Sequence, residues 1–370
     1  MRIVVTGGDG FIGRNLRVRL GELGHREVAS FDKENGDVEL HAALADAEFV
    51  FHLAGVNRPK NDAEFAEGNA TLTASVCAAL RATGRTIPLV YTSSTQAELD
   101  NAYGRSKRAG ELEVERYGAE SGSPAVVLRL TNVFGKWSRP NYNSAVATFC
   151  HNVARGLPIT VNDPNAPLRL VYIDDVVDAM IRLLDAPDAP TGVVDVGPVH
   201  ATTVGEVAAL LAEFVASRET LMMPRVGTGL TRALHATYVS FLPPEKFAYG
   251  LRRHADPRGV FVEMLRTPDC GQFSFFTAGP GITRGEHYHH SKTEKFLVIK
   301  GTARFGFRHI VTGERYELTV GGDDARVVET VPGWTHNITN IGDDEVVVML
   351  WANEIFDPAR PDTIASKVET

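Results

Sequence analysis

Residues 281–301, GITRGEHYHHSKTEKFLVIKG, constrain the fold of this chain more than any other segment. His287 and His289 are two positions apart, and in an extended strand such side chains point to the same face. Glu294 begins a short apolar run just beyond the turn that follows them, so its carboxylate can return toward the two imidazoles. The spacing therefore predicts a small β-barrel whose interior can hold a metal ion.

A second segment, PGWTH at residues 332–336, adds another imidazole. The expected ligand set suits zinc, and also iron, nickel or manganese. It consists of His287, His289, Glu294 and His336. His290 either points away from this cup or acts as a base beside the metal. The two segments resemble the motifs of the cupin superfamily, although Pro332 directly precedes Gly333, where that family usually has one residue between them. The resemblance implies an all-β cupin barrel.

The first residues, MRIVVTGGDGFIG, indicate a different kind of fold. A β-branched run leads through spaced glycines into a helical pattern, which is the fingerprint of a dinucleotide-binding turn. Asp32 ends a second strand-like run about 20 residues later, where a carboxylate can hold a ribose hydroxyl. This favours NAD over NADP, yet Lys33 and Arg14 could offset the repulsion of a 2′-phosphate. The expected cofactor-binding residues in this region are Gly7, Gly10, Phe11, Ile12, Gly13 and Asp32.

Composition limits the partners and the location. A chain of 370 residues with 44% hydrophobic residues can bury two cores, so two domains are expected. The formal charge of −8 provides no overall positive field, so we expect neither nucleic acid nor a membrane as partner. The three cysteines are far apart and odd in number, and the sequence contains no signal peptide or membrane-length apolar run. These features predict a cytoplasmic protein.

The order of patterns along the chain separates the two folds. Up to about residue 195, strand-like runs alternate with amphipathic stretches, which predicts a doubly wound parallel α/β sheet of the Rossmann type. The strand candidates are residues 2–6, 26–31, 49–55, 87–94, 125–130 and 192–197. A helix over 204–219 is expected to close this part, with residues 221–244 as a connection or a dimer-related excursion. Short alternating runs after Phe247 predict the antiparallel barrel, so we place the domains at 1–244 and 245–370.

Tyr103 and Lys107 are four residues apart and share one face of a predicted helix. A lysine near a phenol lowers the phenol's pKa, which makes it a usable proton donor near neutral pH. The strand-like run 87–94 ends in two serines at the carboxyl edge of the sheet, where ligands bind; we favour Ser94 over Ser93 as the catalytic hydroxyl. With the glycine fingerprint, these residues resemble the extended short-chain dehydrogenase/reductase family, whose catalytic Ser, Tyr and Lys correspond to Ser94, Tyr103 and Lys107.

That resemblance also implies binding residues. Positions around the nicotinamide correspond to Leu53, Ala54, Gly55 and Asn69, and Tyr103 and Lys107 also contact the cofactor. In members that act on nucleotide sugars, residues matching Asn132 and Arg169 contact the sugar diphosphate.

The barrel carries a second resemblance. Residues 256–263, DPRGVFVE, and 284–288, RGEHY, are similar to signatures of the deoxysugar 3,5-epimerases, which have a jelly-roll cupin fold. The resemblance implies that Arg258 and Glu263 bind substrate. Those enzymes use the histidine matching His287 as a base and need no metal, whereas the additional ligand candidates here indicate one. We keep His290 as a candidate catalytic residue.

One ketone connects the two halves. A 4-keto sugar nucleotide is acidic at C3, because the enolate is delocalised onto the carbonyl, and the same carbonyl accepts hydride. A reductase followed by a cupin resembles the bifunctional enzymes of the CapF and WbjC type, which serve capsular-polysaccharide and O-antigen biosynthesis. The resemblance implies a homodimer that uses NADPH. The divalent metal, with zinc favoured, is expected from the histidines and the glutamate themselves.

The implied reactions are C3 epimerisation of a UDP-2-acetamido-2,6-dideoxy-4-ketohexose in the cupin and C4 reduction in the other domain. The implied product is UDP-2-acetamido-2,6-dideoxy-L-talose, a precursor of UDP-N-acetyl-L-fucosamine. The main alternative is a nucleotide-sugar 4-ketoreductase whose cupin only senses ligand or mediates dimerisation. A barrel that acts as an iron oxygenase is a further alternative.

Overall fold

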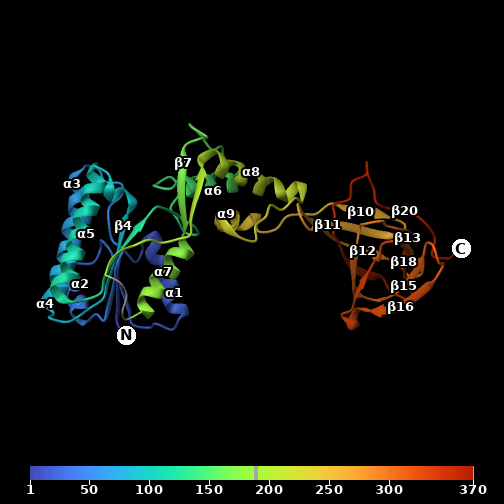
Figure 1. The fold of residues 1–370 in the computed structure, drawn as a ribbon, viewed down its shortest axis with the longest axis horizontal. Helices are drawn as coiled ribbons and strands as arrows, with labels where there is room; N and C mark the ends of the chain where they lie inside the picture. The colour runs from blue at the N-terminus through green and yellow to red at the C-terminus, as the bar shows by residue number, and fades with distance from the viewer. Residues whose placement is uncertain (187–190, 370) are drawn as a thin grey trace. The chain divides into compact units, whose positions relative to one another are not determined.

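The computed structural model describes residues 1–186 and 191–369 (Figure 1). The chain forms two compact units. The first contains Met1–Leu211 and Thr228–Pro243, and the second contains Ala212–Gly227 and the chain from Pro244 onward. In the described part of the chain, no helix is long and apolar enough to cross a lipid bilayer.

A parallel sheet forms the centre of the first unit. Its strands lie in the order β2 (Val28–Phe31), β1 (Ile3–Thr6), β3 (Phe49–His52), β4 (Leu89–Ser94), β5 (Ala125–Leu130) and β8 (Gly192–Val194). Every neighbouring pair is parallel. The strand order reverses at β1 and β3, and such a switch point is where doubly wound sheets bind ligands. The predicted Rossmann-type α/β fold is confirmed.

Helices cover both faces of this sheet (Figure 1). One side carries α2 (Asp37–Asp46), α4 (Leu72–Ala82) and α5 (Ala102–Ser121), and the other carries α1 (Phe11–Glu22) and α7 (Ile173–Asp185). A short helix α3 (Ala63–Phe65) and a π-helical turn, Ala66–Thr71, lead into α4, and a 3₁₀ turn, Thr95–Glu98, follows β4. Fully buried apolar side chains fill the interface between the sheet and α2, α4 and α5, among them Leu44, Val50, Leu80, Leu89 and Val114.

A smaller sheet and three more helices complete the elements up to residue 243. The sheet has the order β6 (Asn132–Phe134), β7 (Pro167–Tyr172) and β9 (Val199–Thr203). The helices are α6 (Ala145–Arg155), α8 (Val204–Thr220) and α9 (Gly229–Ser240). Helix α9 lies inside the segment 221–244, for which the sequence predicted only a connection or a dimer-related excursion and no helix. Its Ala233, Leu234 and Tyr238 are buried at helical spacing, but the Gly and Pro residues around them mask this period in the sequence.

The second unit is built from two antiparallel sheets. One has the order β10 (Arg253–Asp256), β11 (Gly259–Thr267), β12 (Gly271–Ala278), β19 (Val346–Ala352), β14 (Glu294–Lys300) and β17 (Val327–Glu329). The other has the order β16 (Arg315–Gly321), β15 (Thr302–His309), β18 (Trp334–Asn340), β13 (Thr283–Tyr288) and β20 (Ile364–Ala365). Side chains from both sheets form one apolar core, for example Phe276 and Phe296 from the first and Phe305 and Ile338 from the second. The predicted C-terminal all-β fold is confirmed.

Candidate functional sites

The glycine-rich turn after β1 is packed too tightly to accept a side chain at Gly7 or Gly13. A Cβ on Gly13 would lie 2.2 Å from the Gly7 carbonyl oxygen, and one on Gly7 would lie 2.7 Å from the Ala54 backbone nitrogen. Gly7 also has a φ of +70°, a conformation that favours glycine. Gly10 caps α1, which begins with Phe11 and Ile12 and has no acidic residue in its first turn. The positive end of this helix is therefore open to a phosphate.

Asp32 lies beside this turn, as the spacing predicted. Its Oδ2 accepts a hydrogen bond from the Asp9 backbone N–H at 3.0 Å. The Arg14 side chain, one of the two cations expected to offset the carboxylate, donates instead to the Asp9 carbonyl at 2.9 Å. Arg14 therefore does not pair with the Asp32 carboxylate in this structure.

A buried hydrogen-bond chain supports the segment after β3. The Ala54 N–H donates to the Thr6 hydroxyl at 3.2 Å, and the Thr6 hydroxyl lies 2.6 Å from Nδ1 of His52. Nε2 of His52 lies 2.9 Å from the Thr73 hydroxyl, which donates to the Asn69 carbonyl at 2.6 Å. Since Thr73 uses its only hydrogen on that carbonyl, His52 must carry its hydrogen on Nε2 and accept from Thr6 on Nδ1. Burial, followed by the charge of Lys107, lowers the pKa of His52 to about 3, so the ring is neutral.

Asn69 lies in the π-helical turn and is buried. Its amide pairs with both backbone groups of Val56, each at 2.9 Å, and its Nδ2 also donates to the Ser106 hydroxyl at 3.0 Å. Gly55 makes this approach possible, because a Cβ there would lie 2.7 Å from Asn69 Oδ1. The turn thus brings Leu53, Ala54, Gly55 and Asn69 to the same edge of the sheet. The sequence showed the asparagine but not the π-helical turn, which often accompanies functional sites.

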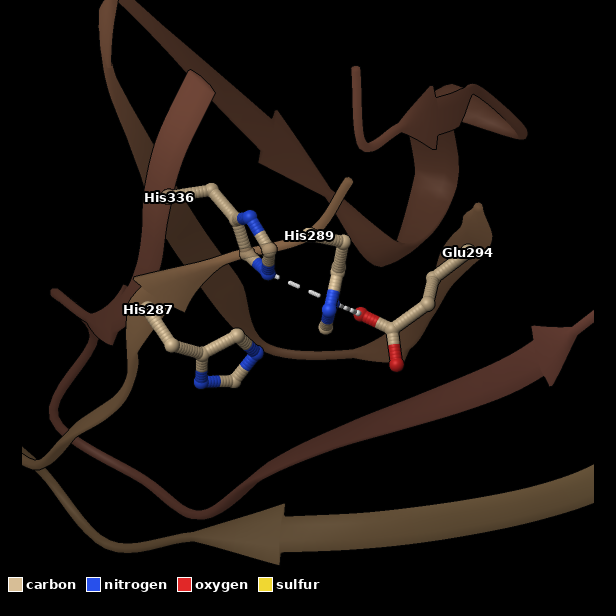
Figure 2. Close-up of side chains that lie close together, drawn as sticks. All are labelled: His287, His289, Glu294 and His336. Atoms are coloured by element: carbon tan, nitrogen blue, oxygen red, sulfur yellow. Dashed lines mark hydrogen bonds and ion pairs between the residues drawn. The ribbon is translucent and has the colours of Figure 1, made fainter. Parts of the chain in front are cut away.

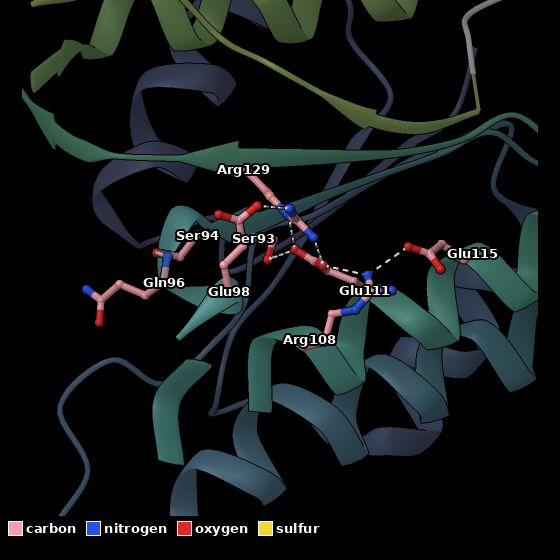
Figure 3. Close-up of polar contacts among 8 residues, drawn as sticks. All are labelled: Ser93, Ser94, Gln96, Glu98, Arg108, Glu111, Glu115 and Arg129. Atoms are coloured by element: carbon pink, nitrogen blue, oxygen red, sulfur yellow. Dashed lines mark hydrogen bonds and ion pairs between the residues drawn. The ribbon is translucent and has the colours of Figure 1, made fainter. Parts of the chain in front are cut away.

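Ser94, Tyr103 and Lys107 come together at the carboxyl end of β4. The Ser94 hydroxyl lies close enough to the Tyr103 phenol to lower its pKa. The Lys107 ammonium donates to the Thr92 carbonyl at 3.0 Å and lies over the Tyr91 ring. Ser93 instead donates to the buried Glu111 carboxylate at 2.6 Å (Figure 3). Of the two serines, it is therefore Ser94 that contacts the phenol.

The pKa values at this site differ from the expectation. Burial raises the pKa of Tyr103, although the Ser94 hydroxyl acts in the opposite direction. Burial lowers the pKa of Lys107 to about 8, partly offset by the charge of Glu111. The expectation that Lys107 lowers the phenol's pKa is not met, because the ammonium is directed to the Thr92 carbonyl and desolvation of the phenol prevails.

Asn132 and Arg169 lie on adjacent strands. Asn132 begins β6, which pairs in parallel with β7, and Asn132 is opposite Leu170. The Thr131 hydroxyl donates to the Arg169 carbonyl at 2.6 Å. Both candidate side chains are exposed, so they are free to meet a ligand at the surface.

The second candidate site is the cup of the β-unit. His287, His289, Glu294 and His336 each offer a ligand atom, and these atoms all lie within 4.8 Å of one another (Figure 2). Glu294 Oε2 lies 3.3 Å from Nε2 of His289 and 3.5 Å from Nε2 of His336. Within the described residues, neither ring nitrogen of the buried His336 has a hydrogen-bond partner. Burying an imidazole ring without a hydrogen bond is costly, and a metal ion would remove that cost.

Irregular backbone directs these ligands inward. A β-bulge interrupts the pairing of β13 with β18 between Gly285 and His287, with positive φ at Gly285 and Glu286. Bulges re-aim side chains, and this one turns His287 toward His336 on the neighbouring strand. The Gly333 N–H donates to the His289 carbonyl at 2.9 Å, and Gly333 has a φ of +80°. The turn at Pro332–Gly333 thus joins the two motifs.

Two residues that the sequence did not single out support the ligands. The Asp362 carbonyl is hydrogen-bonded to Nδ1 of His289. Since a carbonyl only accepts, Nδ1 carries the hydrogen and Nε2 is left to bind a metal. The Asp362 carboxylate accepts backbone N–H groups of residues 290–292. The buried Lys292 lies 3.1 Å from Glu294 Oε1, so the other oxygen, Oε2, faces the imidazoles. The charged side chains of Asp362 and Lys292 can be read in the sequence. Their contacts with the ligand residues cannot, because those contacts depend on the fold.

An apolar cavity of about 160 Å³ opens beside the cup. His287, Glu294 and His336 form part of its wall, together with Arg284, whose Nη2 is buried without a hydrogen-bond partner among the described residues. The rest of the wall is largely aromatic and aliphatic: Phe261, Phe276, Phe296, Phe305, Phe307, Ile338 and Leu350. Such a cavity can hold a small partly apolar ring and exclude water from it.

The other predicted residues of the barrel lie outside this cavity wall. His290 is exposed and its ring packs against Tyr288 at 5.5 Å between centroids. Arg258 pairs with Asp256 at 2.6 Å, and Glu263 pairs with Arg266 at 2.7 Å. The catalytic role of His290 and the substrate contacts of Arg258 and Glu263 therefore stay predictions.

Two family models match the chain. The model described as NAD dependent epimerase/dehydratase family matches residues 3–197. The model described as polysaccharide biosynthesis C-terminal domain matches residues 254–364. Together they cover the parallel sheet with its glycine turn and the barrel with its histidine cup.

Two of the similar known proteins match over nearly the whole chain, and a third matches over about half of it. A reductase from Pseudomonas aeruginosa, UDP-2-acetamido-2,6-beta-L-arabino-hexul-4-ose reductase, is 56% identical over 368 residues, which are 100% of this chain and 99% of the relative. The crystal structure of the capsular polysaccharide assembling protein CapF from Staphylococcus aureus has a TM-score of 0.92 at 42% identity, covering 99% of this chain and 100% of that one. A dTDP-6-deoxy-L-talose 4-dehydrogenase (NAD(P)(+)) from Kitasatospora kifunensis is 30% identical over 250 residues, or 57% of this chain and 78% of the relative.

Proposed function

The chain belongs to the NAD dependent epimerase/dehydratase family, and on that premise we propose that it is a bifunctional nucleotide-sugar enzyme. Residues 1–244 form an NAD(P)H-dependent 4-ketoreductase domain, and residues 245–370 form a cupin epimerase domain. The cupin inverts C3 of a UDP-2-acetamido-2,6-dideoxy-4-ketohexose, and the reductase converts the C4 ketone to the alcohol. The product, UDP-2-acetamido-2,6-dideoxy-L-talose, leads to UDP-N-acetyl-L-fucosamine for capsule or O-antigen synthesis.

One observation carries this proposal. The relative from Pseudomonas aeruginosa is named for reducing a UDP-linked hexul-4-ose and is similar across both units, including the barrel. A ketone at C4 explains a reaction in each unit, since it accepts hydride in the reductase and acidifies C3 for the epimerase. The hydroxyl pair Ser94 and Tyr103 suits the first reaction, and the histidine cup beside an apolar cavity suits the second.

In the reductase site, the chain's own residues position the ketone and supply its proton. The Ser94 hydroxyl donates a hydrogen bond to the C4 oxygen and polarises it. The Tyr103 phenol gives its proton to the same oxygen as negative charge develops there. The high pKa of Tyr103 keeps the proton in place until it is needed. Lys107 orients the ribose of the dinucleotide. When bound, the dinucleotide supplies the hydride.

The residues around the glycine turn fit the dinucleotide. The turn leaves no room for side chains at Gly7 or Gly13, and the start of α1 has no competing acidic residue. We propose NADP(H) as the cofactor by similarity to CapF-type enzymes, with NAD(H) as the alternative that Asp32 favours. Comparison of initial rates with NADPH and NADH decides between them.

In the cupin site, four side chains would hold a divalent metal, zinc in this proposal. His287, His289 and His336 offer imidazole nitrogens and Glu294 offers Oε2, a donor set that suits zinc. When bound, the metal supplies Lewis-acid stabilisation of the enolate that forms on C3 deprotonation. The apolar wall excludes water from the sugar ring. His290 remains the candidate base, and Arg258 and Glu263 the candidate substrate contacts outside the cavity.

Proton exchange tests the proposal most directly. Incubation of the protein with the 4-keto sugar in deuterated water, without nicotinamide, is expected to place deuterium at C3. Addition of NADPH is expected to give one alcohol product. Reduction without any exchange would instead support a ketoreductase whose cupin senses ligand or mediates dimerisation.

The same proposal includes a homodimer in the cytoplasm, where UDP-sugars and NAD(P)H are supplied. Sedimentation equilibrium is expected to give twice the chain's mass. A species of a single chain's mass at working concentration would remove the dimer from the proposal without affecting either reaction.

A further inference from the structure

A buried carboxylate ties the helix of the reductase site to the strand that ends in Ser94. Glu111, on α5, has no exposed surface. Its Oε1 accepts from the Ser93 hydroxyl at 2.6 Å and from Nε of Arg129 at 2.9 Å. Its Oε2 accepts from Arg129 and from Arg108, each at 2.8 Å (Figure 3). Burial alone would raise the pKa of Glu111, but these donors hold it below its ordinary value, so the carboxylate stays charged.

Helix α5 is aligned on β4 by three evenly spaced contacts. Tyr103, Lys107 and Glu111 are four residues apart and share one helical face. Tyr103 lies close enough to Ser94 for the hydroxyl to act on the pKa of the phenol. Lys107 donates to the Thr92 carbonyl, and Glu111 accepts from Ser93. The first two contacts belong to the proposed catalytic groups, and the third is purely supporting. A shift of α5 along β4 would break all three together.

Arg129 extends this support to the turn that Ser94 caps. Arg129 lies at the end of β5, directly beside Ser93 in the sheet. One of its nitrogens reaches Glu98 at 2.7 Å, while the other two hold Glu111. Glu98 ends the 3₁₀ turn Thr95–Glu98, and the Ser94 hydroxyl accepts from Gln96 at the start of that turn. A single guanidinium therefore holds the helix of Tyr103 and the turn of Ser94 at once (Figure 3).

We propose that Arg129 and Glu111 are positioning residues of the reductase, which set the separation of the Ser94 hydroxyl from the Tyr103 phenol. The inference rests on the proposed ketone reduction. Lysine cannot replace Arg129, because only a planar guanidinium presents donors to two carboxylates in fixed directions. Misplacement of a catalytic group by about 1 Å can cost about 100-fold in rate.

The first test compares Arg129→Lys with Arg81→Lys. Arg81 is a matched control, because it too pairs with two carboxylates, Glu113 and Glu120, both on α5. Its side chain is 26% exposed, against 19% for Arg129. Arg129→Lys is expected to lower kcat for ketone reduction about 100-fold with little change in either KM. Arg81→Lys is expected to keep the kcat of the unmodified protein, while its melting temperature is similar to that of Arg129→Lys. Equal kcat values in the two variants would overturn the inference.

A second pair of substitutions, at exposed residues, tests the inference in case Arg129→Lys does not fold. Glu98 is 69% exposed, so Glu98→Gln should fold, and it is expected to lower kcat about 10-fold by releasing the turn of Ser94. Asp100→Asn, on the same loop and paired with Arg105, is the control and is expected to retain kcat. If Glu98→Gln and Asp100→Asn reduce the ketone equally fast, the inference fails. If the unmodified protein reduces no 4-keto sugar with either cofactor, the proposed function fails and the inference with it.

Discussion

Neighbouring serines at the end of β4 show how single residues divide their work. Ser94 contacts the Tyr103 phenol, whereas Ser93 gives its hydrogen to the buried Glu111. The sequence offers two equal hydroxyls at this strand end, and the buried carboxylate on α5 distinguishes them. One serine is therefore left for the substrate, and the other supports the fold.

This division predicts different losses for the two alanine variants. Ser94→Ala is expected to lower kcat for reduction about 100-fold, because a hydrogen bond to the developing oxyanion is lost. Ser93→Ala is expected to keep kcat within a few fold but to lower the free energy of unfolding by about 1–3 kcal/mol, since a buried charged acceptor loses a donor. Steady-state rates and urea unfolding measure both. A larger kcat loss in Ser93→Ala would reverse the assignment.

A second pair of variants separates the two reactions. Tyr103→Phe is expected to reduce NADPH oxidation at least about 100-fold, because the proton donor is removed, while exchange at C3 continues. His289→Ala is expected to do the reverse, since it removes one ligand of the cup. Each variant serves as the folding control for the other. Loss of both activities in both variants would argue for a single shared site.

His52 predicts how the stability of the first unit depends on pH. Its pKa is about 3 in the folded chain against an ordinary 6.5, so between these values the unfolded chain binds more protons. Stability from this group is complete above pH 6.5 and is lost as pH falls toward 3. Urea unfolding at pH 7, 6 and 5 is expected to show a decreasing free energy, and His52→Gln should flatten that slope. An unchanged slope in the variant would assign the effect to other groups.

Whole elements bring distant segments to the cup. Residue 362, near the end of the chain, contacts the backbone of 290–292 and the His289 ring, and β20 pairs with β13 beside His287. The C-terminal segment thus closes over the turn between the ligands. Partners that orient metal-binding histidines commonly contribute 10- to about 100-fold to metal affinity.

We therefore expect Asp362→Ala to weaken zinc binding by about 10- to 100-fold. The carboxylate that holds the turn is removed, although the ligands themselves remain. Competition with a chromophoric chelator measures the affinity. Asp357→Ala is the matched control, because Asp357 caps only its own local turn through Ala359. Equal zinc affinities for the two variants would show that the contact of the Asp362 carboxylate with residues 290–292 does not matter for metal binding.

At the scale of the whole molecule, two compact units carry two separate sets of chemical groups. Removal of metal should therefore affect one reaction only. Dialysis against a chelator is expected to abolish deuterium exchange at C3 and to leave reduction of an already epimerised 4-keto sugar unchanged. Zinc should restore the exchange. Restoration by iron(II) alone, with uptake of oxygen, would support the oxygenase reading of the barrel.

Much of this architecture could be predicted from the sequence because its signals are local. The glycine turn, the Tyr103–Lys107 spacing and the His287–His289 pair each report a geometry within one or two elements. Contacts between distant segments leave no such local period. The role of Glu111 depends on β4 and β5, and that of Asp362 on a turn about 70 residues earlier. Helix α9 was not predicted from the sequence, because glycine and proline flank its short amphipathic pattern.

The chain of hydrogen bonds through His52 has one direction. Every hydrogen in it points from Ala54 through Thr6, His52 and Thr73 to the Asn69 carbonyl. To conduct a proton, the ring would have to gain a charge that its surroundings strongly disfavour. The chain is therefore an insulator, not a relay. It holds the segment after β3 to the π-helical turn without carrying a charge, because its buried ring stays neutral.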